Sequence, residues 1–250
     1  MKTILVVGIG PGDPDQITVQ AIRAIESTDV FFLFDKGEEK SDLAALRTLL
    51  IERYARQGAH RIVEAESPRW SAAGPDYLGL VDDLNARKIA LTKRLIEEAM
   101  GDGERAAILV WGDPALYDST LRILAEINRT LPFETEVVPG ISSLQALAAR
   151  HRAHWNEIGG HVEITTGRRL AQALPDAETS LVMLDSRNAF LAHRGEGLTI
   201  RYGAYVGMAD EILIEGPLDE VADEIVARRA QARARKGWIM DSYMLSRPKG

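Results

Sequence analysis

Three short segments of the chain combine glycine and proline with an acidic or hydroxyl side chain. They read GIGPGDP at residues 8–14, WGDPALY at residues 111–117 and VPGISS at residues 138–143. Glycine allows a backbone to approach a ligand closely, proline stiffens the loop, and carboxylate or hydroxyl groups hydrogen-bond polar partners. Such loops suit the binding of a small polar molecule, for example one with an ammonium or hydroxyl group.

The first segment invites a dinucleotide-binding interpretation because Gly8 and Gly10 follow a strand-like run. That fingerprint requires a third glycine where this chain has Asp13, and a helix that begins at once to face the pyrophosphate. Pro11 and Pro14 delay any helix to about residue 15. We therefore disfavour a pyrophosphate site and expect a rigid loop with exposed amide groups, the alternative being a plain tight turn.

The other two segments also have structural interpretations. Asp113 is placed to accept a hydrogen bond from a ligand, but it could equally cap the next helix. Ser142 and Ser143 offer two hydroxyl groups at a helix start, where an ordinary N-cap is the alternative.

The elements around these segments predict an α/β domain. Apolar, β-prone runs predict strands at residues 3–7, 30–34, 61–63, 106–111 and 134–138. Helical patterns fall between them, near residues 17–25, 41–50, 77–100 and 119–129, and we expect residues 65–76 to form a loop. Alternating strands and helices indicate a mainly parallel sheet, whose carboxyl ends would gather the three segments at one edge.

Beyond residue 153 the pattern changes to strands separated by fewer helices. We expect strands at residues 162–165, 180–184, 200–206, 211–215 and 238–245, the last closing the sheet, and one helix at residues 218–234. We therefore predict an N-terminal α/β domain at residues 1–150 and a C-terminal mixed α+β domain at residues 151–250.

The composition excludes several classes of protein. The absence of cysteine rules out disulfides, thiolate zinc sites and a cysteine nucleophile, and the five histidines lack a metal-binding pattern, so we expect no metal. A formal net charge of -7 argues against general nucleic-acid binding. The apolar runs are too short to cross a membrane and no secretory signal is present, so we expect a cytoplasmic protein.

The three motifs, in this order, resemble the tetrapyrrole methylase family, the class III methyltransferases that use S-adenosylmethionine. The resemblance covers nearly the whole chain. It implies a homodimer of two-domain chains, with the cofactor in the cleft between the domains and S-adenosylhomocysteine as product. It also implies a small-molecule tetrapyrrole substrate.

The resemblance also implies which residues contact the cofactor. Ile9 and Pro11 match the first motif, and Ser142 and Ser143 match the third. The second motif and the looser matches in the second domain contribute Gly112, Asp113, Leu116, Leu184, Met208 and Ala209. The chain departs from the family at residues 184–186, which read LDS, where many members carry a small or aromatic residue.

Within the family, residues 34–43 and 66–70 most resemble members that act in cobalamin biosynthesis. These methylate C1 of a corrin precursor and expel a two-carbon acetyl unit as acetate. Water must attack the acyl carbon, and a general base would help, so we nominate Asp35 and Glu66 near strand ends. Lys36, Arg69 and Trp70 are the nominated substrate contacts.

A substrate with many carboxylates requires a locally basic site. Further candidates for it are Arg61, Arg150, Arg152, Arg168 and Arg169, although each alone has a surface charge as its plainer interpretation. Other functions stay open: a methylase of another precorrin or of uroporphyrinogen, an enzyme modifying ribosomal RNA or diphthamide precursors, and a non-catalytic nucleotide-binding regulator. A nicotinamide oxidoreductase is disfavoured by the missing third glycine.

Overall fold

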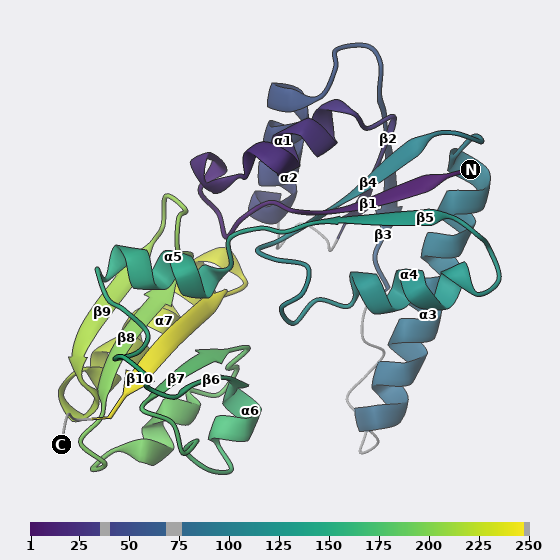
Figure 1. Cartoon of the computed structure of the whole chain (residues 1–250). Helices are drawn as coiled ribbons and strands as arrows, with labels where there is room; N and C mark the ends of the chain where they lie inside the picture. Colours follow the sequence, from purple (N-terminus) through teal and green to yellow (C-terminus); the bar gives the residue numbers. More distant parts are fainter. Residues whose placement is uncertain (36–40, 69–76, 248–250) are drawn as a thin grey trace. The chain divides into compact units, whose positions relative to one another are not determined.

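The computed structural model describes residues 1–35, 41–68 and 77–247, which form two compact units (Figure 1). The first unit comprises Met1–Gly10 and Pro14–Ile141, and the second comprises Pro11–Asp13 and Ser142–Gly250. Helix α5 (Ser143–Arg150) thus belongs to the second unit, whereas the boundary expected at residue 150 placed it in the first.

The first unit is built on a five-stranded sheet in the order β3-β2-β4-β1-β5. Its strands are β1 (Thr3–Gly8), β2 (Val30–Asp35), β3 (Arg61–Glu66), β4 (Arg105–Val110) and β5 (Glu134–Val138). Every neighbouring pair in this sheet is parallel, which confirms the predicted α/β domain.

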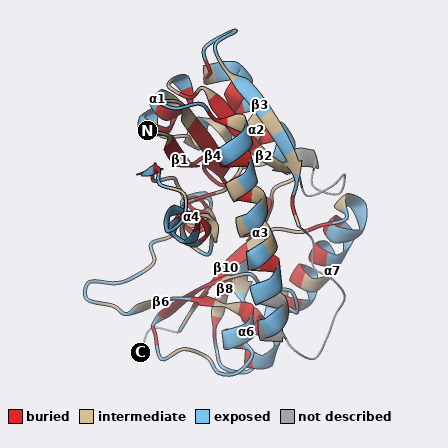
Figure 2. Cartoon of the chain, turned by 90° about the vertical axis from the view of Figure 1, so that its right-hand side faces the viewer, coloured by how far each residue is buried: buried red, intermediate tan, exposed pale blue. Residues whose placement is uncertain are grey.

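Helices cover both faces of this sheet, as Figure 1 shows. They are the 3-10 turn η1 (Pro14–Gln16) and the helices α1 (Val19–Glu26), α2 (Ser41–Tyr54), α3 (Tyr77–Ala99) and α4 (Thr120–Asn128). Alternate residues of β1 serve the two cores, as the two-residue period of a strand requires: Leu5 packs with α1 and α2, and Ile4 with α3 and α4. β1 is buried throughout, and Figure 2 shows the burial of these central strands.

α1 begins well after the first motif. Thr18 is its N-cap, and the Thr18 side chain accepts a hydrogen bond of 3.0 Å from the Ala21 amide. The helix that follows the first motif therefore does not begin directly at the Gly8–Gly10 turn, in agreement with the argument against a pyrophosphate site.

Two elements of the first unit differ in detail from their predictions. β3 continues to Glu66, past the predicted end at residue 63, because backbone pairing with β2 sustains this edge strand where its side chains are largely exposed. α3 is one continuous helix of 23 residues, although its sequence pattern allowed a break.

The second unit has a mixed five-stranded sheet in the order β6-β7-β10-β8-β9, as predicted for an α+β domain. Its strands are β6 (Val162–Thr166), β7 (Thr179–Met183), β8 (Thr199–Ala204), β9 (Ile212–Pro217) and β10 (Asp241–Ser246). The helical segments after α5 are α6 (Gly167–Leu170), η3 (Ala189–His193) and α7 (Leu218–Lys236). β10 lies in the middle of the sheet, whereas the sequence suggested a closing strand. No helix among the described residues is long and apolar enough to span a membrane.

Candidate functional site

The three motif loops come together at the carboxyl edge of the first sheet. They follow β1, β4 and β5, and β1 lies between the other two strands. The Gly112 amide donates a hydrogen bond of 2.8 Å to the Gly10 carbonyl oxygen, and the Gly10 amide returns one of 3.4 Å. The predicted gathering of the loops is therefore confirmed.

Glycine is required where these loops touch, because backbone packs directly on backbone. A Cβ atom on Gly8 would lie 2.6 Å from the Gly140 nitrogen and 2.8 Å from the Gly112 oxygen. A Cβ atom on Gly140 would collide with the same Gly112 oxygen. A side chain at either position would force the loops apart.

The carboxylate of Asp113 connects the second and third loops. Its Oδ2 accepts a hydrogen bond of 2.9 Å from the Gly140 amide, and its Oδ1 accepts one of 2.8 Å from the Ala115 amide. Asp113 is not a helix cap, because α4 begins only after Ser119. Leu116 closes a turn here, because its amide donates a hydrogen bond of 3.2 Å to the Asp113 carbonyl oxygen. Asp113 thus fixes the backbone that any ligand at this edge would meet.

Two predicted cofactor contacts have structural tasks. Ile9 is fully buried in the core under α1 and α2, and its amide donates to the Val110 carbonyl oxygen at 2.9 Å, so its side chain supports the loop from behind. Ser142 caps α5: its hydroxyl accepts from the Leu144 amide at 3.2 Å, while its own amide donates to Gln145 at 3.0 Å. Ser143 is the first residue of that helix.

The tip of the first loop packs against the segment that follows β8, within the second unit. A Cβ atom on Gly12 would lie 2.6 Å from Cγ of Met208, and one on Gly207 would lie 2.8 Å from the Asp13 nitrogen. Pro11, which directly precedes Gly12 in the chain, is also buried. The structure therefore brings Gly12, the neighbour of the predicted residue Pro11, close to the predicted residue Met208.

Arg150 forms ion pairs with residues next to the contact between Gly12 and Met208. Its Nε lies 3.0 Å from Glu211, and its guanidinium forms a longer ion pair of 3.9 Å with Asp13. Glu211 also accepts a hydrogen bond of 2.7 Å from the Gly207 amide. These contacts account for Arg150 without a substrate.

The second sheet also gathers predicted residues at one edge. β6, β7 and β8 run in the same direction, because β7 and β8 are each antiparallel to β10. Leu184 follows β7 and Tyr205 follows β8, with φ angles of 55° and 50° in the left-handed region. Leu184 is 64% exposed. Left-handed residues other than glycine are strained, and they concentrate at ligand sites.

The family of this chain follows from comparison with known proteins. Residues 3–222 match the model of the Tetrapyrrole (Corrin/Porphyrin) Methylases. The chain belongs to this family.

Individual members resemble the chain along its whole length. It is 45% identical over 248 residues to the Precorrin-6A synthase [deacetylating] of Sinorhizobium sp, covering 98% of this chain and 95% of the relative. The crystal structure of a cobalamin synthesis related protein (CobF) from Corynebacterium diphtheriae is 33% identical and covers 100% of both chains, with a TM-score of 0.84.

A more distant structure shares the methylase fold. The uroporphyrin-III C-methyltransferase of Thermus thermophilus, complexed with S-adenosyl homocysteine, has a TM-score of 0.56 at 16% identity. The comparison covers 97% of this chain and 91% of that one.

Residues 184–186 owe their arrangement to Asp185. Asp185 is buried, and its carboxylate accepts hydrogen bonds from the Arg187 and Ala189 amides, at 2.9 and 2.7 Å, and from the Tyr243 hydroxyl at 2.6 Å. Burial raises the pKa of Tyr243, which therefore stays a donor. Asp185 holds the loop that presents Leu184. An Asx turn at Asp185-Ser186-Arg187 was the sequence signal for this role.

Arg229 of α7 ties the same loop to β10. Its Nη2 donates a hydrogen bond of 2.6 Å to the Asp185 carbonyl oxygen, and its Nε donates one of 2.6 Å to Oδ2 of Asp241. Tyr202 also donates to Asp241, at 2.9 Å. Sequence reasoning missed this network because its members are far apart in the chain.

The two nominated bases of the methylase occupy matching positions. Asp35 ends β2, Glu66 ends β3, and the two are partners in the parallel register. Adjacent strands lie about 4.8 Å apart. The backbone thus places both acidic residues side by side at the carboxyl edge, while Lys36, Arg69 and Trp70 lie outside the described residues.

Two basic candidates prove to lie at the wrong sheet edge. Arg61 begins β3 at the amino edge, where it hydrogen-bonds Glu104 at 2.8 and 2.6 Å. Arg152 lines a groove with Thr179 and Ser246, at the amino end of β7. Both assignments are corrected, because neither lies at a carboxyl edge.

Arg168 and Arg169 sit in α6, directly after β6, and so lie at the carboxyl edge of the second sheet. Among the described residues, no group of three or more His, Cys, Asp and Glu could hold a metal ion.

Proposed function

We propose that this protein is an S-adenosylmethionine-dependent C-methyltransferase of cobalamin biosynthesis that converts precorrin-5 to precorrin-6A. It would methylate C1 of the ring and release the acetyl unit as acetate. The observation that carries the proposal is the 45% identity to Precorrin-6A synthase [deacetylating] along 98% of the chain. Membership of the tetrapyrrole methylases supports the reaction class.

The proposed methyl donor contacts residues of the three motif loops and of the segments that follow β7 and β8. In the first unit these are Gly112, Asp113 and Leu116. In the second they are Pro11, Ser142, Ser143, Leu184, Met208 and Ala209, with Ile9 acting through packing. The fold shared with a structure complexed with S-adenosyl homocysteine supports this assignment, as do the strained backbone at Leu184 and the close contact of Gly12 with Met208.

The chemistry requires little acid–base help for methyl transfer itself. Sulfur leaves the sulfonium as a neutral thioether, so the protein contributes mainly proximity and orientation. Deacetylation requires more: water adds to the acyl carbon, the bond from that carbon to the ring breaks, and the electron pair passes to the macrocycle. Acetate departs, the protons pass to a base and solvent, and the ring carbon attacks the methyl group. We assign the base role to Asp35 or Glu66, which the β2–β3 register places together.

A substrate comparison tests the proposal. Purified protein is incubated with S-adenosylmethionine and either precorrin-5 or uroporphyrinogen III, and the products are separated by mass. We expect a methylated, deacetylated product from precorrin-5 alone. Methylation of uroporphyrinogen III, or of precorrin-5 without loss of the acetyl unit, would instead favour another tetrapyrrole methylase. Binding of S-adenosylhomocysteine without turnover of either substrate would favour a regulator.

The family resemblance supports two further proposals, that the protein acts as a homodimer and that it works in the cytoplasm. Light scattering on the purified protein and fractionation of the producing cell test them. A monomer that turns over precorrin-5 at full rate would contradict the first.

A further inference from the structure

The first sheet splits at its carboxyl edge. β2 pairs with β4 only at Val30 and Phe31, although its pairing with β3 continues to Asp35. β4 meanwhile follows β1 as far as Val110. The Leu109 carbonyl oxygen lies in this unpaired stretch of β4 and accepts a hydrogen bond of 2.9 Å from Nε of Arg47, on α2. A side chain therefore replaces the missing strand partner.

A cavity of 160 Å³ lies at this split. Such a volume resembles that of a cavity of about 150 Å³ that holds benzene, and is well below the roughly 300 Å³ at which pockets accept drug-sized ligands. The site therefore suits a ligand of a few heavy atoms. Phe34 and Ser67 also line it, and they directly adjoin Asp35 and Glu66 in the sequence.

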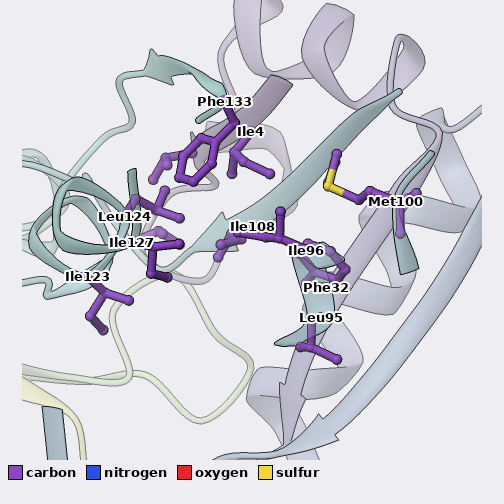
Figure 3. Packing of buried hydrophobic residues seen from close by; sticks show 14 residues of the cluster. Ile4, Phe32, Leu95, Ile96, Met100, Ile108, Ile123, Leu124, Ile127 and Phe133 are labelled. Carbon is purple, nitrogen blue, oxygen red and sulfur yellow. The ribbon is translucent and has the colours of Figure 1, made fainter. Parts of the chain in front are cut away.

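One wall of the cavity is apolar. It is formed by Phe32 and Ile108 of the strands and by Ile123 and Leu124 of α4, all four labelled in Figure 3. These side chains are buried and offer no hydrogen bonds. This wall suits a methyl group.

Another part of the cavity lining carries hydrogen-bond donors and positive charge. These groups belong to Trp111, Arg47 and Lys88. The indole Nε1–H of Trp111 is buried and has no hydrogen-bond partner within the part of the chain that the structure describes. A buried donor without a partner is destabilising, so an acceptor in the cavity would be stabilising. Among the described lining residues, Arg47 and Lys88 carry positive charge and Asp118 negative charge, which leaves a net charge of one positive.

We propose that this cavity binds a small carboxylate, with its methyl or methylene group against the apolar wall and its oxygens toward Trp111 and Arg47. The inference rests on the proposed function, because a deacetylating reaction releases acetate next to Asp35 and Glu66. The same carboxylate chemistry fits an acid side chain of the macrocycle. The geometry thus assigns to the split between β2 and β4 a carboxylate subsite of the reaction.

A titration without tetrapyrrole tests the site directly. Sodium acetate and neutral acetamide are titrated into the wild-type protein at constant ionic strength, and binding is followed by saturation-transfer NMR. We expect acetate to bind at least ten times more tightly than acetamide. Equal binding of the two, or no binding of acetate by folded protein, would overturn the proposal.

Matched variants locate the binding. Trp111→Phe keeps the ring but removes the donor, and Lys88→Met keeps the stem but removes the charge. Each should weaken acetate binding about tenfold, as expected for loss of one interaction with a charged group. Lys93→Met on the same helix, whose ammonium contacts Thr130 at 3.1 Å, should leave acetate binding unchanged. Equal effects of Lys88→Met and Lys93→Met would place the acetate elsewhere.

Turnover distinguishes the two carboxylate sources. If the site holds released acetate, added acetate inhibits the wild-type enzyme and Trp111→Phe needs about tenfold more for the same inhibition. If it holds an acid side chain of the substrate, Trp111→Phe raises KM for precorrin-5 with little change in kcat. Acetate binding by a protein that never turns over precorrin-5 would refute the proposed function alone, while turnover without acetate binding or a KM effect would refute this inference alone.

Discussion

The residues of the proposed donor site act largely through the backbone they hold. Asp113 contacts two amide groups from different loops, Ile9 packs behind the first loop, and Asp185 frames the turn that presents Leu184. An amide held in place by a neighbouring carboxylate requires no reorganisation when a ligand arrives. Changes at these residues should therefore affect ligand affinity through the loops.

Asp113→Asn tests this view at one residue. Asparagine retains one acceptor oxygen, so either the Gly140 or the Ala115 amide loses its partner. We expect S-adenosylhomocysteine to bind about tenfold more weakly by calorimetry, equivalent to about 1.4 kcal/mol. Asp102→Asn, at an exposed residue paired with the chain's N-terminus, is the control. Unchanged affinity in Asp113→Asn would show that the link between the loops does not matter for binding.

The assignment of the base is tested by removing both candidates. Asp35→Asn with Glu66→Gln should lower the rate of acetate release by about 100-fold or more, the usual contribution of a general base. Binding of S-adenosylhomocysteine should stay within twofold. Glu64→Gln on the same strand, also exposed, is the matched control. Undiminished acetate release by the double variant would refute both assignments.

The sequence indicated which residues form the loops, but it did not indicate which side chains contact one another. Glycine, proline and acidic spacing indicated the three loops, because backbone freedom at Gly8 and Gly140 is a local property. The partners of Asp113 and the pairing of Arg61 with Glu104 depend on residues distant in the chain. The loop that carries the left-handed Leu184 has a local Asx signal at Asp185, but its partners Arg229 and Tyr243 lie far away in the chain.

At the scale of elements, the link between α7 and the second sheet depends on Arg229. Replacing it with methionine leaves Asp241 buried without its ion pair and the Asp185 carbonyl oxygen without its donor. Burial already raises the pKa of Asp241, so the unpaired carboxylate is costly. We expect Arg229→Met to lower the free energy of unfolding by about 3 kcal/mol in urea titrations.

The adjacent Arg228 provides the control for this change. Arg228 is half-exposed and lies 3.9 Å from Glu224 on the same helix. Arg228→Met should change the free energy of unfolding by no more than about 0.5 kcal/mol. Equal losses in the two variants would contradict a specific role for the Arg229 network.

The start of β3 carries a pH-dependent ion pair with the turn before β4. The hydrogen bond from Arg61, aided by the Gly101 amide, lowers the pKa of Glu104 from 4.5 to about 2. A depressed carboxyl pKa stabilises the fold above the ordinary pKa, and this stability is lost as pH falls from about 4.5 toward 2. Because the Glu104 side chain is 28% exposed, solvent screening limits the effect to about 1 kcal/mol.

Glu104→Gln should therefore be less stable than the wild type at pH 6 and should approach it as the pH falls to 3. Urea unfolding at several pH values measures the difference. In an Arg61→Met background, the same substitution should show little pH dependence. A pH-independent difference between Glu104→Gln and the wild type would contradict the ion-pair account.

Elements were predicted best where the sequence pattern is strong. The buried strands β1 and β4 and the helix α7 follow from apolar runs and helical spacing. The end of β3 and the central position of β10 were missed, because edge pairing and strand order depend on partners rather than on local composition. The split between β2 and β4 could not be predicted for the same reason, since each strand alone has an ordinary β pattern.

At the scale of the whole molecule, the two units share one feature of their sheets. Each unit ends its parallel strands at an edge that carries glycine turns or left-handed residues: Gly8, Gly112 and Gly140 in the first, Leu184 and Tyr205 in the second. The motifs indicated the family from the sequence, and the match over residues 3–222 confirms it. The proposed substrate within the family rests on identity along 98% of the chain, which extends well beyond the three motifs.

The stoichiometry of one turnover tests the central claim most directly. With precorrin-5 and S-adenosylmethionine as substrates, acetate and S-adenosylhomocysteine are quantified in the same reaction. A deacetylating methyltransferase must release both in a ratio of one to one throughout the time course. Formation of S-adenosylhomocysteine and methylated macrocycle without acetate would contradict the account.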